Sequence, residues 1–274
     1  MAAETRWLER IVGNKRIELE VARTQTPQSL LEKKIAPRTP GAFRMALLGR
    51  SGTQPELAII AELKQRSPSR GLLCPNYDPA AIARGYRRAG ASALSVLTDR
   101  EFFGGSLDHL WEAKASASLP VLRKDFTIAE YHLYEAAVAG ADAVLLIVAV
   151  LEPPELERLH SLSRTLGLDA LVEVHTAAEL QIALDAGAEI IGVNNRDLKT
   201  FEVSLDTSFR LIERIPDGVV AVSESGLRTA GDLERLRAAG FAAFLIGERF
   251  MTEPDPGAAL AQLLSEATAR AAIH

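Results

Sequence analysis

The sequence has a single cysteine, Cys74, among its 274 residues, and it has no long apolar run. One cysteine cannot form a disulfide within the chain, which excludes a disulfide-stapled secreted domain and fits a reducing compartment. The longest apolar stretch, "AVLLIVAVL", falls well short of the roughly 18 residues of a membrane span. The start, "MAAETRWLERIVGNKR", is charged and lacks the apolar core of a secretory leader. We therefore expect a cytoplasmic protein that has no membrane partner.

Positive charge is also scarce. The 31 Lys and Arg residues are outnumbered by 36 Asp and Glu residues, which gives a net charge of -5 and no basic stripe that would bind nucleic acid. No strand-like segment is followed by a Walker loop or by a G-x-G-x-x-G dinucleotide fingerprint. The five histidines are dispersed and show no metal-ligand spacing. These absences predict a small-molecule ligand and chemistry that uses neither a metal nor a cofactor.

One pattern recurs along the chain: a glycine at a helix end, followed by an apolar run. It occurs at residues 88–97, 138–147, 185–193 and 238–247. Glycine suits the left-handed position that ends a helix, and such apolar runs are typical of strands buried on both faces. Four further strand-like segments alternate with these, beginning at residues 57, 119, 169 and 218. The sequence therefore predicts eight strands.

Segments with helical periodicity separate the strands, and several begin with Ser, Thr, Asp or Pro, as helix N-termini do. Strict alternation of eight strands with eight helices predicts an α/β fold that closes into a (β/α)8 TIM barrel, which needs about 250 residues. A doubly wound open sheet is the alternative. Ahead of the first strand, "TRWLERIVGNKRIELEVART" predicts an amphipathic helix, and a Pro-rich connection follows it. We expect residues 1–50 to be an N-terminal helical extension packed on a barrel of residues 51–274, within a single domain.

Five of the predicted strands end in polar residues. The carboxyl ends of the strands form the active site of a (β/α)8 barrel, so these residues are expected to meet at one rim. Taken alone, each pair is better explained as a strand that emerges into solvent, but five pairs on one rim favour a site. They are Glu62 and Lys64, Lys124 and Asp125, Glu173 and His175, Asn194 and Arg196, and Glu224 and Ser225.

Side-chain alternation directs some of these charges inward. Glu62 and Lys64 share a face, because side chains two residues apart on a strand point the same way. By the same rule Lys124 and Glu173 can both reach the barrel interior from opposite sides. A buried charge must be paired or used. A lysine and carboxylates that face each other at low dielectric are suited to proton transfer, so the sequence predicts acid–base chemistry.

Small residues follow the last two predicted strands, in "SESG" and "LIGE". Ser225, Gly226, Gly247 and Glu248 can offer backbone N–H groups, and a short helical turn after "GERFM" is expected to direct its positive end at the same place. Many barrels bind a substrate phosphate with these two loops. The sequence therefore predicts a phosphate site here.

Longer motifs resemble those of one family in content, order and spacing. They are "IIAELKQRSPSRG", "SVLTDREFFGGSLDHL", "LPVLRKDF", "GADAVLLIV", "LVEVHT", "GVNNRDLKTF", "VSESGL" and "FLIGERFM". The chain resembles the indole-3-glycerol phosphate synthases nearly end to end, and in their single-function form. The resemblance implies a cofactor-free and metal-free lyase of tryptophan biosynthesis that converts 1-(2-carboxyphenylamino)-1-deoxyribulose 5-phosphate into indole-3-glycerol phosphate, carbon dioxide and water. It leaves open a weak association with other enzymes of that pathway.

The resemblance also implies roles for individual residues. Lys124 is the implied general acid of ring closure, and Glu173 and Glu62 are the implied carboxylates of the dehydration half, with the proton transfers not divided between them. Lys64 and Asn194 complete the implied catalytic set, with Lys64 beside the anionic groups of the substrate. The implied substrate-binding residues are Ser67, which begins the mobile covering loop "SPSRG", Pro68, Phe126 and Arg196, and the implied phosphate-binding residues are Ser225, Gly226, Gly247 and Glu248.

Two other functions are open to a phosphate-binding barrel. A phosphoribosylanthranilate isomerase is another phosphate-binding barrel, but its Amadori rearrangement depends on a Cys and Asp pair, whereas Cys74 lies behind "SPSRG". A catalytically silent barrel that only binds a phosphorylated ligand predicts the loss of at least one of Glu62, Lys124 and Glu173, and all three are present.

Overall fold

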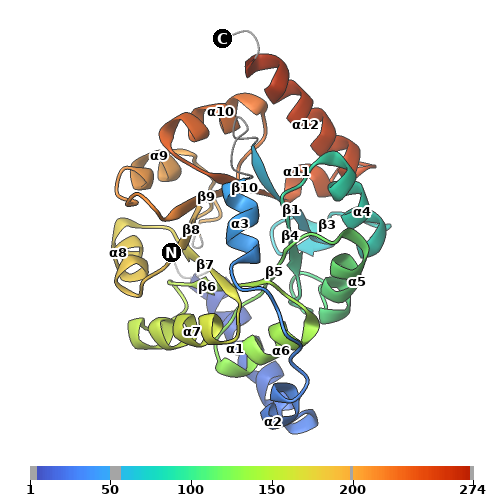
Figure 1. The fold of residues 1–274 in the computed structure, drawn as a ribbon, viewed down its shortest axis with the longest axis vertical. Helices are drawn as coiled ribbons and strands as arrows, with labels where there is room; N and C mark the ends of the chain where they lie inside the picture. The colour runs from blue at the N-terminus through green and yellow to red at the C-terminus, as the bar shows by residue number, and fades with distance from the viewer. Residues whose placement is uncertain (1–4, 50–56, 198–199, 272–274) are drawn as a thin grey trace.

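The chain forms a closed barrel of eight parallel strands (Figure 1). The structure, a computed structural model, describes residues 5–49, 57–197 and 200–271. The ring closes where β1 pairs with β10 on one side and with β4 on the other. The predicted barrel is thus confirmed, and the open-sheet alternative was wrong. The barrel strands are β1 (Ala58–Leu63), β4 (Ala93–Leu97), β5 (Val121–Lys124), β6 (Ala143–Ile147), β7 (Asp169–Val174), β8 (Ile190–Asn194), β9 (Val220–Glu224) and β10 (Ala243–Ile246).

Helices surround the barrel and connect its strands (Figure 1). All eight predicted helices are present: α4 (Pro79–Ala89), α5 (Leu107–Ala117), α6 (Glu130–Ala139), α7 (Pro153–Thr165), α8 (Ala177–Asp185), α9 (Asp206–Ile212), α10 (Ala230–Ala239) and α12 (Pro256–Ala271). Asp78, Ser106, Thr176 and Thr229 each accept a backbone N–H in the first turn of a helix, as the sequence predicts. Among the helices of the described ranges, none is long and apolar enough to cross a membrane.

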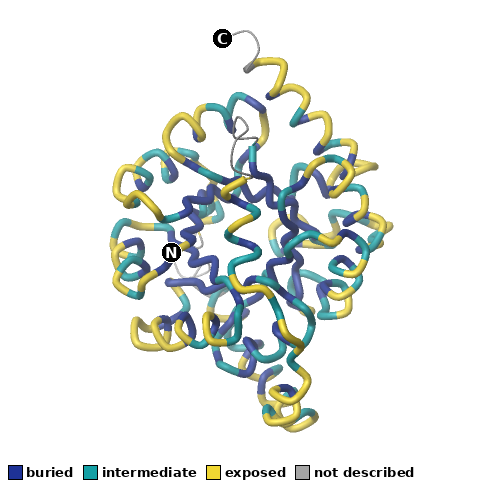
Figure 2. The backbone as a smooth tube through the Cα atoms, in the orientation of Figure 1, coloured by how far each residue is buried: buried dark blue, intermediate teal, exposed yellow. Residues whose placement is uncertain are grey.

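Alternation along the strands separates two layers of side chains. Ile60, Leu122, Leu171 and Val222 belong to an apolar cluster inside the barrel, while their strand neighbours pack outward against the helices. The strands are buried along their length (Figure 2). The inward-facing positions are apolar at the amino ends of the strands and become polar at the carboxyl ends, so the barrel has a dry base and a charged rim.

The base of the barrel is closed by α3 (Ala42–Leu48), which lies in front of the strands in Figure 1. Its Phe43 and Leu47 are fully or almost fully buried in the inner cluster. The Arg44 N–H donates to the Asp169 carboxylate at the start of β7, over 2.9 Å. The sequence predicted only a Pro-rich connection in this region, so α3 and α2 (Gln28–Glu32) were missed. Helices this short show too little periodicity to be recognised, and tertiary packing stabilises them instead.

The predicted N-terminal helix is confirmed as α1 (Thr5–Gln25), which lies behind the strands in Figure 1. Its buried face carries Ile11, Lys15 and Leu19. The predicted covering loop after β1 is more ordered than expected, because it forms a small antiparallel hairpin of β2 (Arg66–Ser67) and β3 (Gly71–Leu72). Residues of α1 and of the β2–β3 hairpin both lie at the rim, where they line the pocket described below.

Candidate active site

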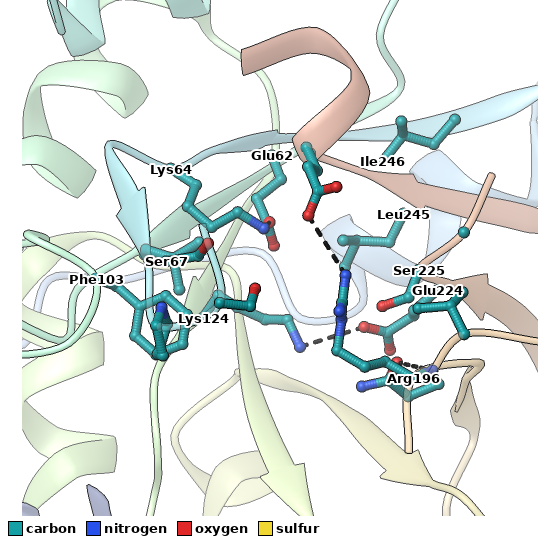
Figure 3. Close-up of a pocket in the computed structure, with 18 of the residues that line it drawn as sticks. Glu62, Lys64, Ser67, Phe103, Lys124, Arg196, Glu224, Ser225, Leu245 and Ile246 are labelled. Carbon is teal, nitrogen blue, oxygen red and sulfur yellow. Dashed lines mark hydrogen bonds and ion pairs between the residues drawn. The ribbon is translucent and has the colours of Figure 1, made fainter. Parts of the chain in front are cut away.

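A pocket of about 470 Å³ opens at the carboxyl ends of the barrel strands. All the residues that the sequence assigned to a site line this one pocket, which is formed by the ends of the barrel strands together with the hairpin and α1. These are Glu62, Lys64, Ser67, Pro68, Lys124, Phe126, Glu173, Asn194, Arg196, Ser225, Gly226, Gly247 and Glu248. Figure 3 labels Glu62, Lys64, Ser67, Lys124, Arg196 and Ser225 among them. Of the polar strand ends, His175 does not reach the lining.

The first strand contributes an ion pair. Glu62 is the last inward-facing residue of β1 and is 4% exposed. Lys64 follows the end of β1, and its Nζ lies 2.6 Å from Glu62 Oε1. Figure 3 shows both side chains on the same side of the pocket. The charges on this strand are therefore paired and face the cavity, and they are not a solvated strand end.

Lys124 occupies the centre of the charged rim. Its Nζ lies 2.7 Å from Glu173 Oε2 and 3.2 Å from Glu224 Oε2, so one ammonium group joins carboxylates from β7 and β9. Burial alone lowers the pKa of this lysine, but the carboxylates of Glu173, Glu224 and Glu62 outweigh it and raise the pKa above the ordinary value. The lysine therefore remains protonated through neutral pH and can act as a proton donor.

Glu173 is held from two further directions. Asn194 Nδ2 donates to Glu173 Oε1 over 3.1 Å, and His175 Nε2 lies 3.5 Å from the same oxygen. Burial favours the neutral acid, but Lys124 and then His175 outweigh it, so the pKa of Glu173 is lowered. The pKa of His175 is raised, because its contacts with Glu179 and Glu173 outweigh its burial. Glu173 is thus an ionised base at neutral pH, oriented by three side chains.

Glu224 also belongs to this cluster; the sequence placed it at the rim but assigned it no catalytic or binding role. Its carboxylate is 2% exposed, and Oε1 is buried without a hydrogen-bond partner in the described structure. Burial raises the pKa of Glu224 to about 7, with Glu173 and Glu62 adding to the effect and Lys124 opposing it. The signal was available, because Glu224 has the same strand parity as the inward-facing Val222. Glu173 and Glu224 therefore differ in ionisation although both contact Lys124.

The Glu224→Gln variant should change how stability depends on pH. The folded state holds the extra proton on Glu224 between the unfolded pKa near 4.5 and the folded pKa near 7. The contribution of this proton to the free energy of unfolding is fully present below pH 4.5 and is lost as the pH rises through the folded pKa near 7. Glutamine is neutral at every pH and does not undergo this loss. The free energy of unfolding of the variant, relative to that of the wild type, should therefore increase by up to about 3 kcal/mol between pH 5 and pH 8.5.

Urea unfolding at a series of pH values measures this difference. The exposed Glu157→Gln change on α7 is the matched control and should leave the pH dependence as in the wild type. Parallel curves for wild type and Glu224→Gln would show that Glu224 is ionised throughout.

Two tight loops follow β9 and β10. Ser225 and Gly226 have consecutive positive φ angles of 66° and 77°, a left-handed conformation that glycine adopts without strain. A Cβ on Gly226 would meet Val203 at 2.4 Å, and one on Gly247 would meet Glu62 Oε1 at 2.3 Å. Both glycines therefore fill positions with no room for a side chain.

The short helix that follows β10 is α11 (Glu248–Met251). The sequence placed a helical turn after "GERFM", whereas the helix is the "ERFM" segment itself. Glu248 is its first residue, and the Glu248 side chain pairs with two arginines: Arg196 NH2 at 3.4 Å (Figure 3) and Arg70 Nε of the β2–β3 hairpin at 3.2 Å. The Glu248 carboxylate thus lies between the covering hairpin and β8.

The opposite side of the pocket is apolar. Phe126, from the loop after β5, and Phe103, from the loop after β4, lie with ring centroids 6.3 Å apart. Trp7, Leu8 and Ile11 of α1 line the same side. The sequence assigned Phe126 but not Phe103 or the α1 residues, since only the fold brings them to the rim. The pocket therefore combines a charged side with an aromatic one.

Metal ligands do not converge in the described ranges, where no three His, Cys, Asp or Glu side chains form a group able to hold a metal ion.

Comparison with known proteins agrees with the fold and the motifs. The family model for indole-3-glycerol phosphate synthase matches residues 8–263. A protein of that name from Albidiferax ferrireducens is 47% identical over 265 residues, which is 95% of this chain and 98% of the relative. Another from Chlorobium phaeovibrioides is 49% identical over 245 residues, covering 89% and 93%.

Solved structures with low identity share the architecture. Thiamine phosphate pyrophosphorylase from Pyrococcus furiosus aligns with a TM-score of 0.59 at 15% identity, over 78% of this chain and 97% of that one. A mandelate oxidase aligns with a TM-score of 0.60 at 18% identity, over 88% and 92%. These two show the barrel fold alone. The family match and the identities near 50% over almost the whole length show more: the chain belongs to the indole-3-glycerol phosphate synthase family.

Proposed function

We propose that the protein is an indole-3-glycerol phosphate synthase of tryptophan biosynthesis. It converts 1-(2-carboxyphenylamino)-1-deoxyribulose 5-phosphate into indole-3-glycerol phosphate, with loss of carbon dioxide and water. The observation that carries this proposal is the position of Lys124, a protonated amine buried between Glu173 and Glu224 and facing an aromatic wall. The family relation supports the same reaction.

Ring closure needs a proton donor at the substrate ketone. As the aromatic ring attacks the carbonyl carbon, negative charge develops on the oxygen, and Lys124 neutralises it by donating a proton. The raised pKa of Lys124 keeps the donor charged until that moment. Loss of the carboxylate as carbon dioxide then restores the aromatic ring, and this step requires no further proton.

Dehydration needs an acid for the departing hydroxyl and a base for the proton that is lost. Glu173, Glu62 and Glu224 are the lining carboxylates that raise the pKa of Lys124, and they are not equivalent. The pKa of Glu173 is lowered and that of Glu224 is raised to about 7, so the cluster holds a base and a partly protonated acid at neutral pH. Lys64 and Asn194 hold Glu62 and Glu173 in place through the contacts described above.

The remaining groups recognise the two ends of the substrate. The anthranilate ring lies against Phe126 beneath Pro68 and Ser67 of the hairpin, and its carboxylate faces the planar guanidinium of Arg196. The phosphate accepts hydrogen bonds from the backbone N–H groups of Ser225, Gly226, Gly247 and Glu248. The Glu248 side chain points to Arg196 and Arg70 instead. A backbone contact of this kind tolerates an acidic residue at the phosphate.

The direct test is to incubate the purified protein with 1-(2-carboxyphenylamino)-1-deoxyribulose 5-phosphate in buffer without added metal and to follow indole fluorescence. The proposal requires formation of indole-3-glycerol phosphate, and no product at neutral pH would overturn it. The isomerase alternative has little support, because Cys74 does not reach the pocket lining.

Gly226→Asp should chiefly raise KM. The substitution adds a negative charge against the proposed phosphate, and its Cβ lies at a positive φ within 2.4 Å of Val203. We expect KM to rise by about tenfold or more, since one buried charge repulsion exceeds about 1.4 kcal/mol. Steady-state kinetics measures this change. Gly187→Asp is the matched control, because Gly187 has φ of 78° with no atom near its Cβ, and it should leave KM unaltered. An equal KM in both variants would show that the phosphate does not bind at Gly226.

A further inference from the structure

A buried lysine outside the catalytic cluster connects α1 to the rim. Lys15 interrupts the otherwise apolar face formed by Ile11 and Leu19, and only 3% of its side chain is exposed. An ammonium group in such a place must be fully paired, because an isolated buried ion costs several kcal/mol or more. The proposed reaction assigns no step to it.

Three carboxylates surround this ammonium. Lys15 Nζ lies 2.7 Å from Glu18 on its own helix, 3.0 Å from Asp99 after β4 and 2.9 Å from Asp125 after β5. Asp99 and Asp125 are almost completely buried. Burial opposes the charge of Lys15, yet Asp125 and Asp99 outweigh it and raise the pKa of the lysine. Lys15 is therefore a permanent cation that joins one helix to the ends of two barrel strands.

The two aspartates also hold the backbone of the aromatic wall. Asp99 Oδ1 accepts the Phe102 N–H over 2.8 Å, and Phe103 is the next residue. Asp125 Oδ1, which also contacts Lys15, accepts the Phe126 N–H over 2.8 Å. The backbone N–H groups of Phe126 and of Phe102, the residue before Phe103, are thus held by the two carboxylates that share one ammonium group.

The two aspartates depend on Lys15 to different extents. Asp125 has a second cation, since Arg123 NH2 lies 3.1 Å away, and Thr98 Oγ1 donates to it over 2.6 Å. Within the described residues, Lys15 is the only cation that forms an ion pair with Asp99. Burial raises the pKa of Asp99 in spite of Lys15. Loss of the lysine would leave Asp99 as an uncompensated buried charge and would release the loop that carries Phe103.

We propose that Lys15 is a positioning residue that fixes the separation of Phe103 and Phe126, and with it the slot for the substrate's aromatic ring. The proposal rests on the function given above, in that the ring is the occupant of this slot. It predicts that Lys15 affects affinity for ring-bearing ligands without affecting recognition of the phosphate, which lies across the pocket.

The test is to compare Lys15→Met with wild type in calorimetric binding of two ligands, indole-3-glycerol phosphate and glycerol 3-phosphate, which lacks the ring. We expect the Kd of indole-3-glycerol phosphate to rise at least tenfold, with the Kd of glycerol 3-phosphate unchanged. In turnover, KM should rise by a similar factor and kcat should stay within about threefold of wild type. Arg16→Met, on the exposed side of the same helix, is the control and should match wild type. Lys15→Arg should recover most of the lost affinity.

A neutral double variant keeps the test decisive if Lys15→Met does not fold. Lys15→Met with Asp99→Asn leaves no uncompensated charge at residue 99. It still removes the ion pairs that join α1 to the ends of β4 and β5, so it should show the same selective loss. Unchanged affinity for indole-3-glycerol phosphate in a folded variant, or an equal loss for both ligands, would overturn the proposal. A wild type that makes no indole-3-glycerol phosphate would instead contradict the proposed function.

A measurement without ligand tests the role of Lys15 independently of the proposed function. With Trp111→Phe, Trp7 on α1 becomes the remaining tryptophan, and it packs edge-on against Phe102 with centroids 6.2 Å apart. Lys15→Met should make Trp7 more accessible to iodide quenching, whatever the substrate. Unchanged quenching would show that Lys15 does not fasten the helix to the wall.

Discussion

Lys124→Met is expected to reduce kcat by about 10³-fold or more while the substrate still binds. The side chain keeps its length and loses the proton donor, and general acids of this kind contribute about 10²- to 10⁴-fold in rate. The charge that stabilises the developing alkoxide is lost as well, which adds to the effect. Binding should persist because the phosphate loops and the aromatic wall lie on other elements. Single-turnover kinetics and equilibrium binding with the same preparation measure the two quantities.

Lys124→Arg separates the two contributions of this lysine. Arginine keeps the positive charge between Glu173 and Glu224, but it does not release a proton at any pH at which the protein is folded. A loss as large as that in Lys124→Met would identify proton donation as the main contribution. Near-normal turnover in Lys124→Met itself would show that the acid has been misassigned.

Glu173→Gln is expected to reduce kcat by about 10²- to 10⁴-fold, for a different reason. The amide cannot accept the proton that the carboxylate accepts. It also removes the nearest anion from Lys124, whose Nζ lies 2.7 Å from Glu173. Since Glu173 is the carboxylate that raises the pKa of Lys124 most, the pKa of Lys124 should fall in the variant.

The pH–rate profile measures that second effect. Deprotonation of Lys124 sets the alkaline limb, so the limb should move to lower pH in Glu173→Gln, while the wild type retains activity to higher pH. Glu179→Gln is a useful comparison, because Glu179 contacts His175 behind Glu173 and does not line the pocket. If Glu173→Gln keeps more than a tenth of the wild-type kcat and the alkaline limb of its pH–rate profile does not shift, then Glu173 only orients its neighbours and is not the base.

The barrel and most of the site could be predicted from the sequence because both follow local rules. Each strand contains a short apolar run, and several helices start at a capping residue or end near a glycine, so the alternation is readable without tertiary information. Strand parity then indicates which charges face inward, as for Glu62 and Lys124. The confirmed fold brings the predicted site residues to a single pocket.

The parts that were missed depend on distances across the barrel. The register and tilt of eight strands bring Lys124 Nζ to 3.2 Å from Glu224, and no local pattern contains that distance. Gly192 leaves room within β8 for this carboxylate, since a Cβ there would lie 2.0 Å from Glu224 Oε1. Lys15 appears as one charge on an amphipathic helix, although its partners Asp99 and Asp125 lie in later segments. Each of these residues is explained only by a neighbour distant in the chain.

The position of α3 has a consequence for the order of folding. Arg44 contacts Asp169 and Gly218, which lie 125 and 174 residues further along the chain. Phe43 and Leu47 pack among inward-facing residues of strands up to β10. Contacts this distant in sequence form only after the intervening chain has been ordered, which makes them slow to form. The helix α3, which is synthesised before every barrel strand, therefore gains its buried contacts among the last, and docking of α3 marks the completion of the barrel.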